Sequence, residues 1–197
     1  MRCRLAIAAA VIPLLAGCAA GSSGSRSSSA SAAPSTQQLK VRAALDPCPA
    51  GATRPATAVG QLPDLELRCL GDGPAVRLSA LRGVPTVVNL WAAWCAPCRT
   101  EAPAFQRLHA AAGDRVRVLG VLTEDTDRDA LDAAAHLGIH YPSVVDGDGR
   151  VLDRTGVRAL PVTYFVEPSG RSHRYVGPPL GYVALRALVA RHLGVRV

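Results

Sequence analysis

Two cysteines separated by two residues carry the clearest chemical signal in the sequence, in the segment Trp94-Cys95-Ala96-Pro97-Cys98. This segment follows an apolar, β-branched run over 86–91 and opens a helical pattern over 98–112. Cys95 is therefore expected at a helix N-terminus, where unpaired amides and the helix dipole favour an anion. Such a setting lowers the pKa of a thiol and supplies thiolate, the nucleophile of thiol–disulfide exchange. Cys98, one turn into the helix, would resolve the mixed disulfide that forms.

The alternative interpretation of this cysteine pair is half of a zinc site. A structural zinc ion takes four ligands at close spacing. The sequence has no second pair of this kind, its five histidines show no ligand spacing, and Cys48 and Cys69 are not arranged as a partner pair. We therefore expect neither a metal ion nor another cofactor.

The elements that must position the pair are predicted from hydrophobic periodicity and turn residues. In chain order they are a first strand within 62–70, a turn or short helical piece at 77–82, a buried strand at 86–91, a helix at 98–112, a strand at 115–122, a helix at 127–137, a hairpin of strands at 162–167 and 172–176, and a last helix at 180–193. Helices that alternate with strands before a hairpin predict an α/β fold, with a central mixed β-sheet flanked by helices.

The N-terminus has the pattern of an export signal. Arg2 and Arg4 precede an apolar stretch over 5–16, which is shorter than the roughly 20 residues of a membrane-spanning helix. The stretch ends in Leu15-Ala16-Gly17-Cys18, which resembles a bacterial lipobox. The resemblance implies that Cys18 carries lipid and anchors an extracytoplasmic protein to the cell membrane. In the alternative, an ordinary cleaved signal peptide, Cys18 has no role.

Four segments are expected in the chain. Residues 1–18 are a lipoprotein signal peptide, 19–45 a flexible tether rich in Ser, Ala and Gly, 46–60 an N-terminal extension, and 61–197 the folded domain. The tether is expected because such a composition buries too little apolar surface to offset its ordering entropy.

Two further cysteines, Cys48 and Cys69, remain once Cys3 leaves with the signal peptide and Cys18 is lipidated. An even number in an oxidising compartment favours a disulfide. We predict that Cys48 and Cys69 form a structural disulfide that pins the extension to the domain and stabilises it by roughly 3 kcal/mol. Two free thiols, or a second redox pair that passes electrons to the first, are the alternatives.

The charge pattern gives little support to nucleic-acid binding. The net charge is +7, yet the basic residues are interleaved with acids and aromatic residues make up only 4% of the chain. A nucleic-acid site would need a basic stripe or patch with aromatic stacking platforms. We expect no nucleic-acid partner.

The motif, taken with its surroundings, resembles the thioredoxin superfamily, and most of all its extracytoplasmic TlpA/ResA/DsbE-type proteins. Residues 84–105 carry the resemblance, the similarity covers roughly residues 60–194, and its most specific part is the Trp-Cys-x-Pro-Cys segment at 94–98. Three further residues match the family pattern: Pro103 inside the active-site helix, Pro161 before the third strand, and Glu101 three residues after Cys98. The resemblance implies a thioredoxin-like fold.

The resemblance also implies roles for single residues. Pro161 would be a cis-proline that faces the cysteines, keeps metal away from them and leaves the backbone of Leu160 free to pair with a substrate peptide. Glu101 would relay protons to the pair, or it is simply an acid that complements the helix dipole. Trp94 would shield Cys95, with Ala96 and Pro97 as supporting neighbours. Independently of the resemblance, the position of Glu124 after the strand at 115–122 makes it either a site residue or part of an acidic loop that caps the next helix.

The function that the resemblance implies is thiol–disulfide exchange with extracytoplasmic protein dithiols or disulfides. It favours a reductase, with a place in cytochrome c maturation, over a disulfide-forming oxidase of the Dsb type. A membrane redox partner would then reset Cys95 and Cys98. The direction depends on a reduction potential that the sequence does not reveal.

Two other functions are less favoured. A peroxidase of the peroxiredoxin type has a lone peroxidatic cysteine after a Pro and Thr motif, from which this segment departs. A copper chaperone of similar fold has three residues between its cysteines and a distant histidine, whereas Cys95 and Cys98 enclose two.

Overall fold

A computed structural model of the protein describes residues 33–50 and 62–197. Its elements are α1 (Thr36–Ala43), β1 (Glu66–Leu67), β2 (Val76–Arg77), the short 3-10 helix η1 (Leu78–Ala80), β3 (Thr86–Trp91), α2 (Ala96–Ala112), the 3-10 helix η2 (Gly113–Arg115), β4 (Arg117–Thr123), α3 (Asp127–Leu137), β5 (Ser143–Asp146), α4 (Arg150–Thr155), β6 (Val162–Val166), β7 (Ser172–Tyr175) and α5 (Tyr182–Leu193). The expected signal peptide with Cys18, and parts of the tether and of the extension, lie outside the described residues.

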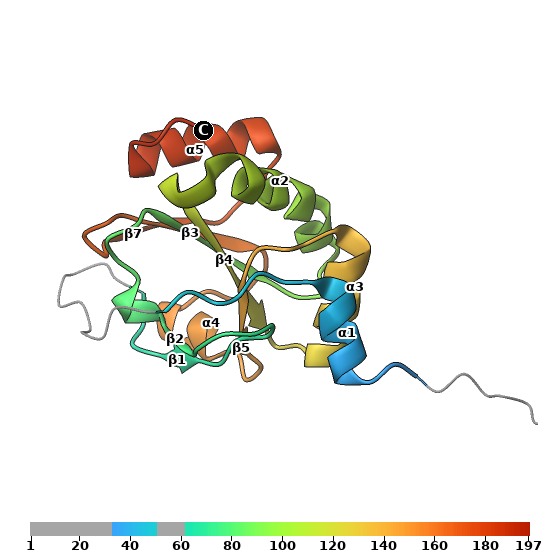
Figure 1. The fold of residues 1–197 in the computed structure, drawn as a ribbon. Helices are drawn as coiled ribbons and strands as arrows, with labels where there is room; N and C mark the ends of the chain where they lie inside the picture. The colour runs from blue at the N-terminus through green and yellow to red at the C-terminus, as the bar shows by residue number, and fades with distance from the viewer. Residues whose placement is uncertain (1–32, 51–61) are drawn as a thin grey trace, which may run out of the picture. The chain divides into compact units, whose positions relative to one another are not determined.

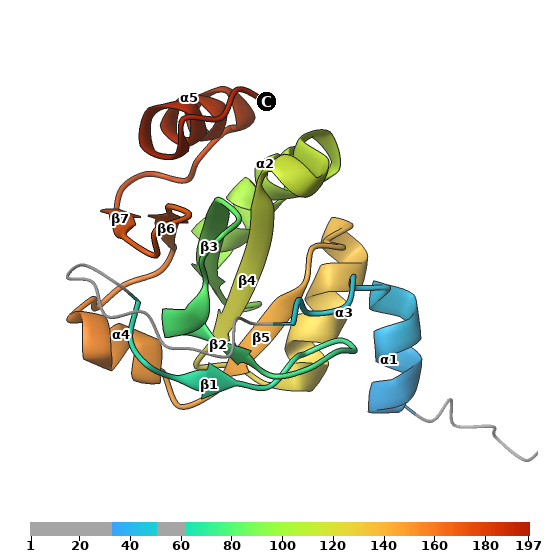
Figure 2. The same cartoon turned by 60° about the vertical axis from the view of Figure 1, so that its left-hand side comes forward.

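A mixed sheet of five strands forms the centre of the domain, in the order β5-β4-β3-β6-β7 (Figures 1 and 2). Strands β3, β4 and β5 run parallel, whereas β6 is antiparallel to β3 and pairs with β7 in a hairpin. The parallel strands are connected through α2 and α3, as parallel pairs require. This arrangement confirms the predicted α/β class with a mixed sheet flanked by helices.

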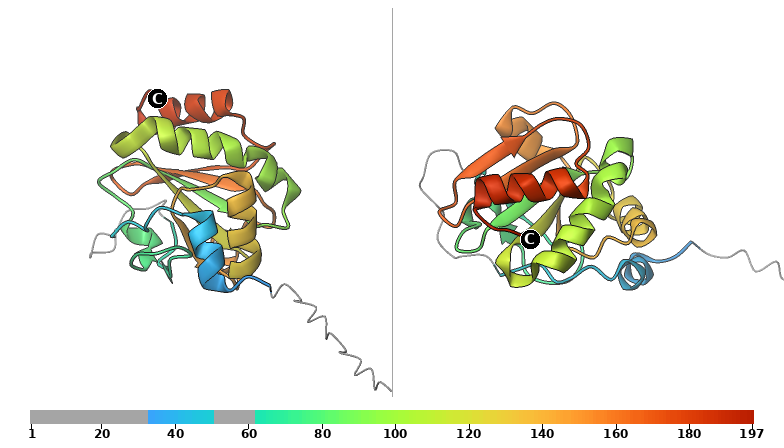
Figure 3. Two further views of the ribbon diagram at one scale, coloured as in Figure 1. Left: turned by 45° about the vertical axis from the view of Figure 1, so that its right-hand side comes forward. Right: turned by 90° about the horizontal axis from the view of Figure 1, so that it is seen from above.

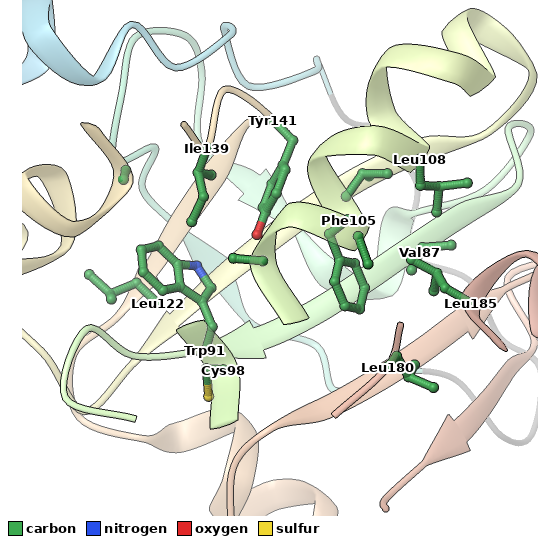
Figure 4. Packing of buried hydrophobic residues seen from close by; sticks show 14 of the residues in the cluster. Val87, Trp91, Cys98, Phe105, Leu108, Leu122, Ile139, Tyr141, Leu180 and Leu185 are labelled. Carbon is green, nitrogen blue, oxygen red and sulfur yellow. The ribbon is translucent and has the colours of Figure 1, made fainter. Parts of the chain in front are cut away.

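Two hydrophobic clusters cover the two faces of the sheet. On one face, Val87 and Trp91 of β3 pack among α2, α3 and α5 (Figure 4). On the other, Val88 and Leu90 pack against the β1–β2 region and α4. Alternate side chains of a strand point to opposite faces, so a strand that is buried on both sides is apolar along its length. Helices α2 and α5 lie side by side on the first face (Figure 3).

Helix α1 lies within the tether that the sequence analysis expected over 19–45. Ser35 caps the helix, and Leu39 and Ala43, four residues apart, are buried against the rest of the domain. Helix α1 packs beside α3 (Figure 2). The last part of the expected tether is therefore wrong: these residues are helical because one face of the helix carries buried apolar side chains.

A disulfide joins Cys48 to Cys69 across 21 positions of sequence. Cys48 is buried, and Cys69 forms an isolated bridge with Val144 of β5. The bond thus attaches the segment after α1 to the edge of the sheet.

Among the residues that the structure describes, no helix combines the length and apolarity that crossing a bilayer requires.

Candidate active site

The two cysteines of the motif lie where β3 gives way to α2. Strand β3 ends at Trp91, and Cys95 is the N-cap residue of α2, so that its Sγ accepts a hydrogen bond from the backbone N–H of Cys98 at 3.3 Å. Cys95 and Cys98 are joined in a disulfide, and both are buried. Pro97 occupies the first turn, where a residue without an N–H leaves no helical hydrogen bond unmade. A thiolate formed at Cys95 would accept the same hydrogen bond and lie at the positive end of the helix.

Trp94, the residue before Cys95, does not belong to the core. Its side chain is 57% exposed, and its indole N–H donates to the backbone carbonyl of Glu124 at 3.0 Å. Glu124 sits in the turn between β4 and α3, with a positive φ of 52°. The sequence left Glu124 as either a site residue or part of a helix cap. In the structure, its backbone carbonyl accepts the hydrogen bond from Trp94, and the N-cap residue of α3 is Thr126.

Glu101 is buried on α2, one turn after Cys98. One carboxylate oxygen accepts a hydrogen bond from the Asn89 amide at 2.7 Å, and the other accepts one from the backbone N–H of Leu180 at 3.1 Å. Burial raises the pKa of Glu101, although the hydrogen bonds from Leu180 and Asn89 oppose this shift. A buried carboxyl with a raised pKa is suited to hold and release a proton.

Sequence reasoning missed both partners of Glu101. Asn89 lies in the middle of β3, and Leu180 precedes α5. A polar residue inside the apolar run over 86–91 was the available signal for Asn89, because a buried amide needs a partner.

The peptide bond between Leu160 and Pro161 is cis. Strand β6 begins at the next residue, and its pairing of Val162 with Leu90 places Pro161 opposite Trp91, at the end of β3 that leads to the cysteines. Leu160 and Pro161 are half-buried. The start of β6 and the motif therefore lie at the same end of the sheet, whereas Pro103 lies further along α2 and is exposed.

The described part of the chain has no group of three or more His, Cys, Asp or Glu side chains that could hold a metal ion.

The hydroxyl of Tyr141 and the indole N–H of Trp91 are buried in the cluster between the sheet and the helices, without a hydrogen-bond partner among the described residues (Figure 4). Burial raises the pKa of Tyr141, so this phenol stays neutral.

A family model with the description AhpC/TSA family matches residues 59–171. The chain belongs to the AhpC/TSA family. The fold, a mixed sheet with the motif at the start of α2, is that of thioredoxin-like proteins, as the sequence resemblance implied.

Individual relatives refine this assignment. The chain is 30% identical to the thiol-disulfide oxidoreductase ResA of Oceanobacillus iheyensis over 118 residues, which are 58% of this chain and 62% of ResA. It is 37% identical to the thiol:disulfide interchange protein DsbE of Xylella fastidiosa over 111 residues, 55% of each chain. The matched part thus spans less than two thirds of these relatives. The structure of MTB DsbF superposes with a TM-score of 0.61 and 27% identity, over 68% of this chain and 98% of that one.

Proposed function

We propose that this protein is a thiol–disulfide oxidoreductase that exchanges disulfides with extracytoplasmic protein partners through Cys95 and Cys98. The observation that carries the proposal is the Cys95–Cys98 disulfide at the N-terminus of α2, with Cys95 as the cap residue. The names of the ResA and DsbE relatives support the same chemistry.

The reductive cycle begins with Cys95 and Cys98 in the reduced, dithiol form. The Cys95 thiolate attacks one sulfur of a partner disulfide, a mixed disulfide forms, and the other partner sulfur leaves as a thiolate that takes up a proton. The Cys98 thiol then loses its proton and attacks Cys95, which releases the second partner thiol. The partner gains two electrons and two protons, and Cys95–Cys98 becomes a disulfide. The reverse sequence of steps oxidises a partner.

Neighbouring groups have distinct tasks in this cycle. The backbone of Leu160, beside the motif, would pair with an extended segment of the partner as an added strand. Trp94, exposed next to Cys95, would provide apolar contact with that segment. Glu101 would take the proton from Cys98 and return it, since its raised pKa lies closer to neutral pH than that of an ordinary glutamate.

In the cell, the protein would act as a reductase in cytochrome c maturation, with oxidase activity as the alternative direction. A lipid on Cys18 would attach it to the outer side of the cell membrane, and a membrane redox partner would return Cys95–Cys98 to the reduced state. The Cys48–Cys69 disulfide would be structural, because it joins two segments at the sheet edge rather than at a helix start. A reduction potential near that of thioredoxin, about −270 mV, would support a reductase, and one near that of DsbA, about −120 mV, an oxidase.

The proposal is tested by the reduction of insulin disulfides with dithiothreitol as electron source. The protein should accelerate the reduction, and the Cys95→Ser variant should lose this acceleration. Two parallel assays on the same sample, consumption of hydrogen peroxide and binding of Cu(I), address the peroxidase and the copper chaperone. Turnover of peroxide or tight Cu(I) binding without insulin reduction would replace the proposed function by one of these.

A further inference from the structure

The carboxylate of Asp125 holds the loop that leads into Cys95. One oxygen accepts a hydrogen bond from the backbone N–H of Ala93 at 2.5 Å, and the other accepts one from the N–H of Thr126 at 2.7 Å. Asp125 is half-buried in the turn between β4 and α3. One side chain therefore connects the loop before the cysteines to the start of α3.

The turn that carries Asp125 is itself fixed in place. The carbonyl of Glu124 accepts the Trp94 indole N–H, and the N–H of Glu124 donates to the carbonyl of Asp146 at 3.2 Å. The side chain of Glu124 covers Gly149 so closely that a Cβ atom there would lie 2.8 Å from Glu124 Cγ. The loop before Cys95 is thus hydrogen-bonded to this turn at two successive residues, Ala93 and Trp94.

Asp125 also brings a negative charge close to the reacting sulfur. Ala93 is two residues before Cys95, and two extended residues span about 7 Å, so the carboxylate lies within roughly 10 Å of Cys95. A negative charge at this range disfavours a thiolate and so disfavours the reduced pair relative to the disulfide. No basic side chain forms an ion pair with Asp125 in the part of the chain that the structure describes.

We propose that Asp125 is a positioning residue for the Cys95–Cys98 exchange, which holds the loop before Cys95 and makes the pair more reducing through its charge. The part that concerns catalysis rests on the proposed function. The part that concerns the redox equilibrium rests only on the disulfide and on the placement of Asp125.

The experiment compares Asp125→Asn and Asp125→Ala with the unaltered protein. Asparagine loses the charge but keeps an oxygen for the Ala93 N–H, whereas alanine loses both. The matched control is Asp129→Asn, which removes a carboxylate from the same helix start. Asp129 contacts Thr126 and makes no hydrogen bond to the loop before Cys95.

The first measurement is the equilibrium with glutathione at about pH 8, above the pKa range of thiols at helix N-termini. Two glutathione molecules reduce the Cys95–Cys98 bond to two thiols and leave as one glutathione disulfide. Alkylation and mass spectrometry of the tryptic peptide 83–99, which contains both cysteines, separate this bond from Cys48–Cys69. We expect the equilibrium constant for reduction of Cys95–Cys98 by glutathione to rise about threefold in both Asp125 variants, which raises the reduction potential by about 15 mV. The constant should stay unchanged in Asp129→Asn.

The second measurement is the rate of insulin reduction. We expect it to fall severalfold in Asp125→Ala and to stay closer to that of the unaltered protein in Asp125→Asn, because only alanine releases the Ala93 N–H. The inference would be overturned if the equilibrium constant for reduction were unchanged or lowered in the Asp125 variants. It would also be overturned if Asp129→Asn raised this constant equally. If the unaltered protein does not reduce insulin, the proposed function fails, while the glutathione equilibrium still decides the role of the Asp125 charge.

Discussion

The hydrogen bond between Asn89 and Glu101 gives a sharp test of the buried carboxylate. Asn89→Ala removes one of the two described donors to this group, and a hydrogen bond to a charged partner contributes about 1.5–3 kcal/mol. We expect the free energy of unfolding to fall by about 2 kcal/mol at about pH 8, which corresponds to a decrease of about 4–8 °C in Tm for a domain of this size.

The same variant should show a specific pH dependence. Burial places the folded-state pKa of Glu101 above its unfolded value, so stability falls as the pH rises through the interval between the two. Asn89 stabilises the charged form, and its removal raises the folded pKa further. The loss in Asn89→Ala should therefore be largest above this pKa and shrink to about half as the pH falls below it and Glu101 becomes protonated in both proteins.

Denaturant unfolding at several pH values measures this difference, and Glu101→Gln supplies the control. In the Glu101→Gln background, the effect of Asn89→Ala should no longer depend on pH, because the titrating group is gone. A loss that is equal at all pH values, or a pH dependence that survives Glu101→Gln, would refute the assignment of this hydrogen bond to a charged Glu101.

Further predictions concern the disulfide at the sheet edge and two buried positions. Replacement of Cys48 and Cys69 together by alanine should lower the free energy of unfolding by about 3 kcal/mol and leave insulin reduction intact, whereas loss of exchange would indicate a redox role for this pair. Gly149→Ala should destabilise by more than about 1 kcal/mol in urea unfolding, since a Cβ at a φ of 69° would also press against Glu124; an unchanged midpoint would contradict the described packing. Phe105→Ala, at a fully buried position of α2, should cost about 3–5 kcal/mol by the same measurement, and a cost below about 1 kcal/mol would show that the core is arranged differently.

The elements next to the motif could be predicted from sequence because their patterns are long and locally consistent. Strand β3 has the predicted bounds, and α3 begins at Asp127 and ends at Leu137 as expected. Strand β5 and helix α4 were missed, since their four and six residues are too short to show periodicity. The first strand was overestimated, because only Glu66–Leu67 of the expected run pairs with a neighbour.

The contacts that shape the site are long-range, which is why sequence patterns did not reveal them. Glu101 meets Leu180 across 79 positions of sequence, and Ala93 meets Asp125 across 32. Glu101 itself was a candidate through the family resemblance, but its partners depend on how α2 and α5 pack. The acidic residues after β4 drew attention to the correct turn, although the side chain that reaches the active-site loop belongs to Asp125 and not to Glu124.

The division of labour between the two sulfurs is tested most directly by trapping the mixed disulfide. Cys98→Ser and Cys95→Ser would each be reduced, incubated with insulin or another disulfide-bonded protein, and examined by non-reducing electrophoresis and mass spectrometry. A stable adduct through Cys95 is expected with Cys98→Ser, because the resolving thiol is absent, and no adduct is expected with Cys95→Ser. An adduct of comparable yield through Cys98, or exchange activity that persists in Cys95→Ser, would contradict the account.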